Sequence, residues 1–189
     1  MIHTDTFFEN FKPISGVLSA FQREGVKFII DGFEACPYLT DHRHLAYMLA
    51  TTKHETANTY RPIAEYGKGK GRQYGIPACN GNVYYGRGYV QLTWERNYKV
   101  MQARLKALGI ETDLVNNPDD AMKQDIALQI MFVGMHEGLF TGKKLKDYFN
   151  EWCDDAVHAR KIINGLDKAK MIAGYYYEFN AALKLARNA

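Results

Sequence analysis

The sequence predicts a mainly α-helical protein that forms one domain over residues 1–189. Three observations support this prediction. Apolar residues recur at helical spacing through most of the chain, one irregular stretch rich in glycine and tyrosine interrupts them, and no repeat or linker marks a second domain. At 189 residues the chain can bury a sizeable core without disulfides or a metal.

The N-terminal segment is expected to begin with two helices. Thr4 or Asp5 can cap a short one that ends before Pro13. Ser19 can cap a longer one that ends before Pro37.

A third helix is expected to begin after a cap at Thr40 or Asp41. Its apolar stripe has the spacing i, i+3, i+4, i+7: Leu45, Met48, Leu49 and Thr52. The same register places Glu55 on this face, seven residues after Met48. A carboxyl group there would be partly removed from water, which favours its acid form.

Periodicity is lost over residues 58–82, where glycine, proline and asparagine predict a loop or short hairpin. Thr93 is then expected to open a helix that stops at Gly109, and the segment N-N-P-D-D to start another that ends near Gly138. Further helices are expected around residues 145–149, 152–163 and 169–186.

Charge and cysteine usage exclude several classes of protein. The net charge is only +3 and the basic residues are dispersed, so the footprint of a nucleic-acid-binding protein is absent. A polyanionic bacterial envelope remains a compatible partner. Cys36, Cys79 and Cys153 are odd in number and widely spaced, which argues against a disulfide framework and against a zinc site. They are expected to be buried or half-buried thiols, and no metal or cofactor is expected.

The N-terminus shows no signal peptide, and no apolar run approaches the roughly 18 residues that span a bilayer. Synthesis in the cytosol is therefore expected, with any export depending on another factor.

The candidate chemistry lies between His54 and Tyr98, which holds seven of the 16 glycines and seven of the 13 tyrosines. Glycine allows close approach of backbone to a ligand, and tyrosine offers a flat face with a polar tip, so an extended polar substrate is indicated. The only acids there are Glu55, Glu65 and Glu95. Glu55 on an apolar face and Glu65 in a polar loop fit the division of acid and base roles in glycosidases. Taken singly, each has a plainer interpretation: Glu55 as a buried acid paired with an arginine, and Glu65 as a solvated charge.

Three other site types were considered. The zinc-protease pattern H-E-x-x-H fails, because Asn58 stands where the second histidine is required. The glycines of residues 67–75 do not have the spacing of a phosphate-binding loop. A peptidase using Cys79 and His54 remains as a remote alternative.

The motifs K-H-E-T-A, Y-Y-G-R-G-Y-V-Q-L-T-W-E-R-N-Y, L-V-N-N-P-D-D-A and I-I-N-G, spread over residues 54–165, resemble the family 19 glycoside hydrolases. That family includes plant-type chitinases and many phage endolysins. The resemblance implies a lysozyme-like, mostly α fold with a deep cleft between two lobes. The compact chain and the segment E-G-L-F-T-G-K-K-L are most similar to a phage or prophage endolysin.

The resemblance also implies residue roles. Glu55 is similar to the general acid, Glu65 to the general base, and Thr93 to the residue that helps to hold the attacking water. Six further positions are expected to bind substrate: His54, Tyr85, Arg87, Gln91, Asn97 and Asn164. For Gln91 and Asn97 a bracing role in the loop is the alternative.

Two further expectations concern sugar stacking and a family arginine. Sugar rings are expected to lie against tyrosines such as Tyr84, Tyr85 and Tyr89. The family often has an arginine after the I-N-G motif, but only Lys168 and Lys170 are nearby, so that role is unassigned.

The expected function is that of a monomeric endolysin that hydrolyses β-1,4 bonds of peptidoglycan by an inverting two-carboxylate mechanism. It would be made in the host bacterial cytoplasm and act in the periplasm or cell wall after release, as a single catalytic domain without a separate cell-wall-binding domain. The alternatives are a chitinase and a non-catalytic glycan-binding module. The C-terminal helix is expected to pack its aromatics on the core; alternatively, Lys170, Lys184 and Arg187 would help it to contact the envelope or outer membrane.

Overall fold

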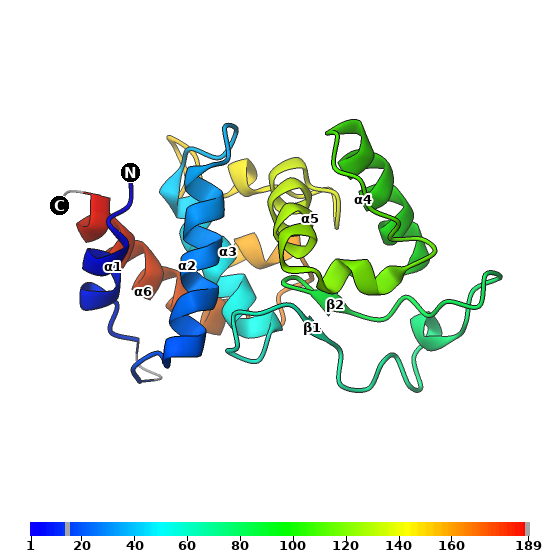
Figure 1. Ribbon diagram of the computed structural model, residues 1–189. Coiled ribbons are helices and arrows are strands. Elements are labelled where there is room, and N and C mark those ends of the chain that lie inside the picture. The colour runs from blue at the N-terminus through cyan, green and yellow to red at the C-terminus, as the bar shows by residue number, and fades with distance from the viewer. Residues whose placement is uncertain (14–15, 188–189) are drawn as a thin grey trace.

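The computed structural model describes residues 1–13 and 16–187. Figure 1 shows the helices along the described chain: α1 (Thr4–Asn10), α2 (Ala20–Glu34), α3 (His42–Glu55), α4 (Glu95–Ala107), α5 (Gln124–Glu137) and α6 (Ala169–Arg187). Short 3-10 turns form at Gln73–Gly75, Pro118–Met122, Leu145–Asp147 and His158–Ile162. Strands β1 (Ile63–Ala64) and β2 (Arg87–Gly88) pair antiparallel. The predicted mainly α class is confirmed.

Several helix ends follow the local sequence. The Ser19 side chain accepts a hydrogen bond from the Gln22 backbone N–H, and the Gln22 side chain accepts one from the Ser19 backbone N–H, which makes a capping box. Asp41 caps α3 by accepting from the Arg43 backbone. Gly138 ends α5 with φ of +78°, a conformation that favours glycine. The cap expected at Thr4 or Asp5 is wrong, because both residues lie inside α1.

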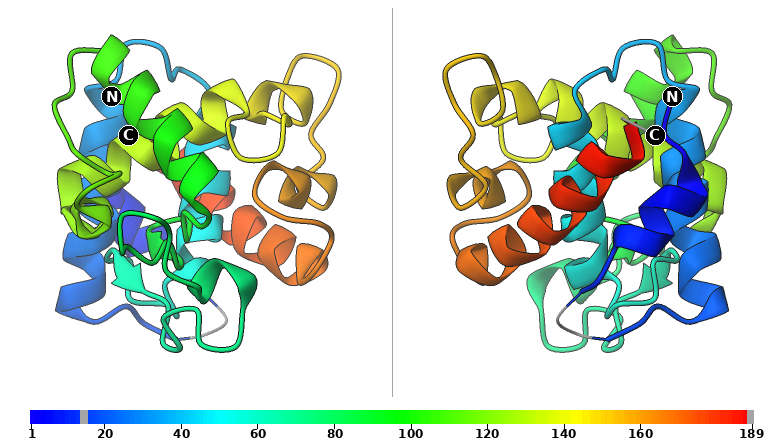
Figure 2. Two further views of the ribbon diagram at one scale, coloured as in Figure 1. Left: turned by 90° about the vertical axis from the view of Figure 1, so that its right-hand side faces the viewer. Right: turned by 90° about the vertical axis from the view of Figure 1, so that its left-hand side faces the viewer.

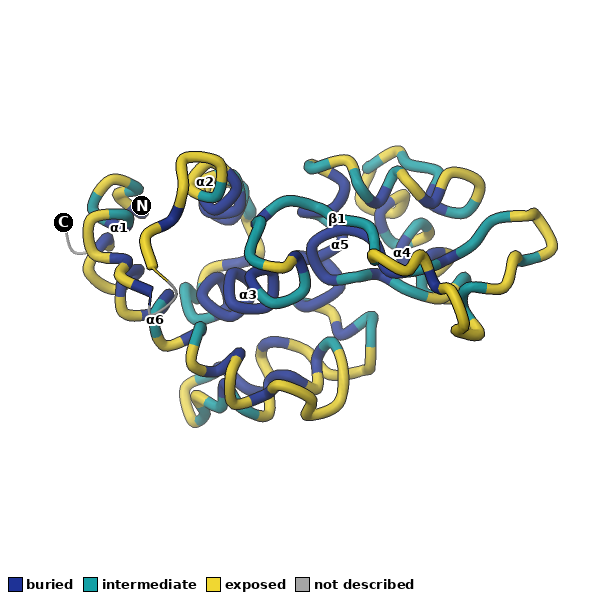
Figure 3. The backbone as a smooth tube through the Cα atoms, turned by 90° about the horizontal axis from the view of Figure 1, so that it is seen from below, coloured by how far each residue is buried: buried dark blue, intermediate teal, exposed yellow. Residues whose placement is uncertain are grey.

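The core is built around α3 and α5, which are buried over most of their length (Figure 3). Helix α6 packs along α3 and against α1, and the Phe11 and Phe179 rings stack at 4.4 Å. The His3 backbone N–H donates to the Ala186 carbonyl, so the two ends of the described chain lie together (Figure 2). In Figure 1, α4 and segment 65–86 lie on the opposite side of α5 from α1, α2 and α6.

The helix expected over residues 152–163 does not form as an α-helix. Residues 158–162 make only a 3-10 turn, and an antiparallel bridge between Phe149 and Asp154 folds the preceding segment back on itself. The Tyr176 hydroxyl donates to Asp154 at 2.7 Å, so a contact with α6 fixes this turn. Residues 145–149 likewise give a single 3-10 turn.

Helix α6 uses its apolar face in the core. Tyr176, Phe179 and Leu183 are buried, as the packing interpretation predicted. Lys170, Lys184 and Arg187 are exposed, so any envelope contact would rest on charge and not on the buried aromatics. In the described part of the chain, no helix is long and apolar enough to cross a membrane.

Candidate active site

A cavity of about 510 Å³ opens beside the end of α3. It brings together residues from five separate parts of the chain: Glu55, Tyr74, residues 90–94 with Asn97, Phe140, and residues 163–164. Five of the residues predicted from the sequence therefore line one space: Glu55, Gln91, Thr93, Asn97 and Asn164.

Glu55 is the last residue of α3, and its side chain is 14% exposed. The Arg160 Nη1 group donates to Glu55 Oε1 at 2.6 Å, and Arg160 Nε donates to the Asp167 carbonyl at 3.1 Å. Arg160 is itself buried. The two side chains form an ion pair at the end of α3. The guanidinium holds one Glu55 oxygen and leaves the other available to a ligand in the cavity.

Arg160 was not identified from the sequence. The arginine was expected after the I-N-G motif, near Lys168 and Lys170, whereas Arg160 precedes Asn164 by four residues. Glu55 pairs with an arginine, as its plainer interpretation predicted, and it also lines the cavity. Pairing with Arg160 therefore does not exclude a catalytic role for Glu55.

Glu65 follows β1 and is held by two donors. The Tyr74 hydroxyl donates to Oε1 at 3.0 Å, and the Gly86 backbone N–H donates to Oε2 at 3.2 Å. Burial raises the pKa of Tyr74, and the hydrogen bond to Glu65 raises it further, so Tyr74 remains a neutral donor. Tyr74 lines the cavity, whereas Glu65 is not among the residues that line it.

Residues 91–97 form a hydrogen-bonded turn on the cavity wall. Gln91 Nε2 donates to the carbonyls of Ile63 and Gly88, at 3.1 and 3.2 Å. The Thr93 hydroxyl donates to the Gln91 carbonyl at 2.8 Å, and Asn97 Nδ2 donates to the Thr93 carbonyl at 2.9 Å. These side-chain donors therefore brace the backbone of the cavity wall.

The aromatic residues at the cavity differ from those expected. Tyr84 and Tyr89 are buried in the core, at 2% and 0% exposure, so neither can lie against a sugar ring. Tyr74 and Trp94 line the cavity instead, with their rings edge-to-face at 5.4 Å. Trp94 has φ of +74°, a strained conformation for a bulky residue and one that is found most often at functional sites.

Arg87 and Tyr85 do not line this cavity. Arg87 is 5% exposed, pairs with Asp119 at 2.7 Å and donates to the carbonyls of Val83 and Tyr85. Its guanidinium lies 3.5 Å from the centre of the Tyr85 ring. The expected substrate contact of Arg87 is therefore corrected: this residue holds the loop together.

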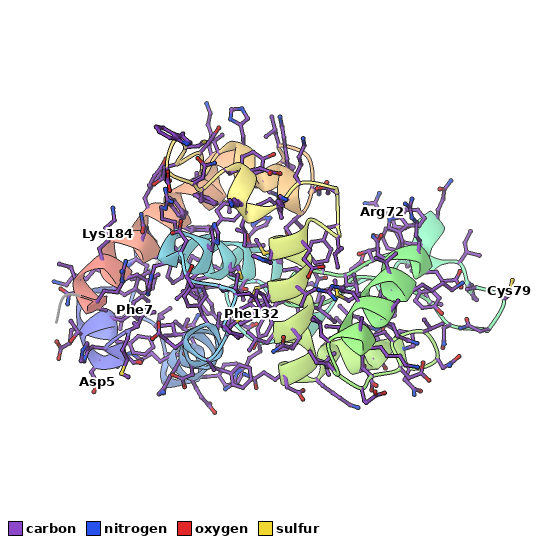
Figure 4. All side chains as sticks on the ribbon, turned by 90° about the horizontal axis from the view of Figure 1, so that it is seen from above. Asp5, Phe7, Arg72, Cys79, Phe132 and Lys184 are labelled. Carbon is purple, nitrogen blue, oxygen red and sulfur yellow. The ribbon has the colours of Figure 1, made fainter. Side chains whose placement is uncertain are left out.

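His54 faces a separate hollow that Lys53, Asn58 and Tyr175 also line. Burial lowers the pKa of His54, with a smaller opposing effect from Glu55. The structure contradicts the alternative of a peptidase that uses Cys79 and His54. Cys79 is exposed at the outer end of segment 65–86 (Figure 4), whereas His54 lies on the core helix α3. The expectation that all three thiols are at least half-buried is also wrong at Cys79.

Over residues 1–13 and 16–187, no three histidine, cysteine, aspartate or glutamate side chains gather in a way that could hold a metal ion.

Sequence comparison finds plant chitinases. The chain is 40% identical over 83 residues to an acidic endochitinase of Petunia hybrida and 37% identical over 95 residues to a basic endochitinase of Vitis vinifera. These matches cover 41% and 42% of this chain but only 28% and 29% of the plant proteins. No protein-family model matches the chain.

Structural comparison extends over nearly the whole chain. Chitinase C from Streptomyces griseus superposes with a TM-score of 0.59 at 22% identity, covering 96% of this chain and 75% of that one. A class IV family 19 chitinase from Zea mays gives 0.55 at 20% identity, covering 95% and 92%. The expected lysozyme-like helical fold is confirmed by this likeness, and the sequence matches independently support the resemblance to family 19 chitinases.

Proposed function

We propose that this chain, which is related to the family 19 chitinases in sequence and in fold, is a glycoside hydrolase with Glu55 as its general acid. The observation that carries the proposal is the Glu55 carboxyl group at the wall of a 510 Å³ cavity, with one oxygen fixed by buried Arg160. A carboxyl group held in this way can deliver its proton to a glycosidic oxygen in a defined direction. General acid catalysis of this kind contributes roughly 100- to 10,000-fold to the rate.

Glu65 is the proposed base. Tyr74 and the Gly86 N–H hold its carboxylate in one orientation, at 3.0 and 3.2 Å. The attacking water is placed in the cavity that Glu55, Tyr74 and Thr93 line, where the Thr93 oxygen can accept a hydrogen bond from it and Tyr74 joins it to Glu65. This arrangement supports inversion of the anomeric configuration. NMR of the first products should show the α-anomer from a β-linked substrate; early β-anomer would refute the role of Glu65.

The proposed substrate is peptidoglycan, and the proposed biological role is that of an endolysin. A cationic loop, defined as Lys68, Lys70 and Arg72, supports it: all three are exposed, and none has an ion-pair partner in the described chain. Tyr74 ties this loop to Glu65 beside the cavity. Peptidoglycan carries carboxylates on its peptides, whereas chitin is uncharged, so unpaired cations on the segment just before Tyr74 favour peptidoglycan. Release from the host cytoplasm to the cell wall is part of the same proposal.

The deciding experiment is mass spectrometry of products from purified sacculi and from chitin oligomers, for wild-type protein and Glu55→Gln. Muropeptides with new reducing ends would support the proposal, and reducing-end identity would show which of the two bonds is cut. Products from chitin alone would identify a chitinase. Tight binding without products from either polymer would identify a glycan-binding module.

The cationic loop can be tested separately by replacing its three cations with glutamine. Because exposed charges act mainly on association, activity on sacculi should fall several-fold, and the fall should shrink as salt is raised. Activity on neutral oligomers should not change.

A matched control replaces three exposed lysines elsewhere: Lys12, Lys106 and Lys184. An equal loss of activity on sacculi in this control would assign the effect to net charge and would remove the argument for peptidoglycan from the cationic loop.

A further inference from the structure

A second and larger cavity, of about 720 Å³, lies away from the candidate active site. We call it the Trp152 groove; it is lined by residues at the start of α3, His136 near the end of α5, and residues 146–152. It shares no lining residue with the cavity at Glu55. His44 in its wall precedes Glu55 by eleven residues on one helix, which corresponds to about 16 Å along the axis.

The loop that carries Trp152 is fixed to the core. The Asn150 backbone N–H donates to the Cys153 carbonyl at 2.9 Å, which closes the turn. Arg43 Nη1 donates to the carbonyls of Asn150 and Cys153, at 3.0 and 3.3 Å. The other two nitrogens of this guanidinium donate to the Asp41 carboxylate. An isolated antiparallel bridge joins Phe149 to Asp154 at the base of the turn. The loop is therefore held in one conformation at the mouth of the groove.

Trp152 has no packing role in this arrangement. Its side chain is 92% exposed, although the Trp152 backbone N–H is anchored by the Asn150 side chain at 2.9 Å. A large indole left in water on a rigid loop is a preformed platform for a ligand with a flat apolar face. Across the groove, Tyr38 rests on His136 with ring centres 5.0 Å apart and offers a second aromatic surface.

The polar groups of the groove balance in charge. Two acids, Asp41 and Glu151, are matched by two cations, Arg43 and Lys146. Burial lowers the pKa of both His44 and His136, so both rings are neutral near pH 7. The groove therefore lacks the single-sign field that binds a polyanion or a polycation.

Balanced donors and acceptors beside an aromatic platform suit a neutral ligand with hydroxyl and amide groups and a flat apolar face. A pyranose ring has such a face, formed by its C–H groups. We propose that the Trp152 groove is a second saccharide-binding site that holds a glycan strand outside the active-site cavity. The identification of this strand as part of the polymer that is cut rests on the function proposed above. By binding the same insoluble polymer at two places, the protein would remain attached between cleavage events.

Sedimentation of Glu55→Gln protein with purified sacculi and with insoluble chitin tests this proposal without interference from hydrolysis. Adding Trp152→Ala should weaken binding to at least one polymer by roughly five- to tenfold, the range expected for loss of one aromatic contact. Trp152→Phe should recover part of it. The matched control is Tyr177→Ala, which removes a 55% exposed aromatic on α6 and should leave binding unchanged.

Equal binding by the parent and Trp152→Ala, or an equal loss in Tyr177→Ala, would overturn the proposal. So would a change in oligomeric state of Trp152→Ala on size-exclusion chromatography with no change in binding, since Trp152 would then be a protein contact. Absence of products from the wild-type protein would count against the hydrolase function alone, because the sedimentation measurement requires no turnover.

Discussion

Replacing Glu55 with glutamine should affect catalysis and stability by separable amounts. The amide preserves the shape of the side chain but has no proton to deliver, so the rate on sacculi should fall roughly 100- to 10,000-fold. The variant should still fold, because the amide oxygen can accept the Arg160 hydrogen bond that Glu55 Oε1 accepts at 2.6 Å.

The stability effect follows from the burial of this pair, whose side chains are 4% exposed at Arg160 and 14% at Glu55. Deleting one partner of a buried ion pair costs about 3–5 kcal/mol when the remaining charge is left without a partner. Glutamine retains an acceptor, so the cost should be closer to 1–3 kcal/mol. For a domain of this size, that corresponds to a fall in Tm of roughly 3–10 °C.

A double-mutant cycle isolates the pair. Arg160→Met leaves the Glu55 carboxylate in the cavity wall without its partner and should lose more stability than Glu55→Gln. The double variant should lose less than the sum of the two, because no stranded charge remains. Glu95→Gln is the matched control: its partner Lys99 is an exposed i, i+4 residue on α4, and such a pair contributes little.

The assays are sacculus turbidity for the rate and calorimetry for Tm. More than a tenth of wild-type activity in Glu55→Gln would refute its role as the acid. Additive effects of the two single variants would refute the coupling of Glu55 to Arg160.

Three further predictions follow from the site. Tyr74→Phe removes one of the two donors to Glu65 and should reduce kcat several-fold with little change in Tm; an unchanged kcat would show that Glu65 needs no orientation by Tyr74. Gln91→Ala and Asn97→Ala should each lower both kcat and the free energy of unfolding, the latter by about 1–2 kcal/mol, because their amides donate to backbone carbonyls. A fall in kcat with no change in Tm would instead show that these side chains bind the substrate. Four histidines have pKa values lowered from 6.5 mainly by burial: His42, His44, His54 and His136. Below pH 6.5 the unfolded chain therefore binds more protons than the folded one, so Tm should fall as the pH is lowered from 7 to 5. In His44→Gln the difference between Tm at pH 7 and Tm at pH 5 should be smaller than in the wild-type protein.

Local chemistry explains why the helices that form the site were predictable. The caps at Ser19 and Asp41 and the stop at Gly138 each depend on a few neighbouring residues, and each forms as expected. The register of α3 follows from its apolar stripe, and this alone places Glu55 at a partly buried helix end. These features required no knowledge of the rest of the chain.

The missed residues depend on contacts between distant segments. Arg160 reaches Glu55 across 105 positions in sequence, from a segment in which an α-helix was expected. The burial of Tyr84 and Tyr89 was missed for a related reason: β2, the strand between them, is two residues long, too short for alternation to show which side chains face the core. Trp152 was assigned to the same expected helix, whereas Arg43 holds its segment as a turn.

The most specific motif, Y-Y-G-R-G-Y-V-Q-L-T-W-E-R-N-Y, serves mainly to build the wall of the site. Arg87 is buried against Asp119 and backbone carbonyls, and the donors of Gln91, Thr93 and Asn97 all go to carbonyls of the same loop or of β1. A glycine-rich loop pays a large conformational entropy for order, and these bonds offset it. The side chains that line the cavity are therefore held by the same hydrogen bonds that order the loop. A substitution that loosens the loop should reduce turnover without touching the substrate.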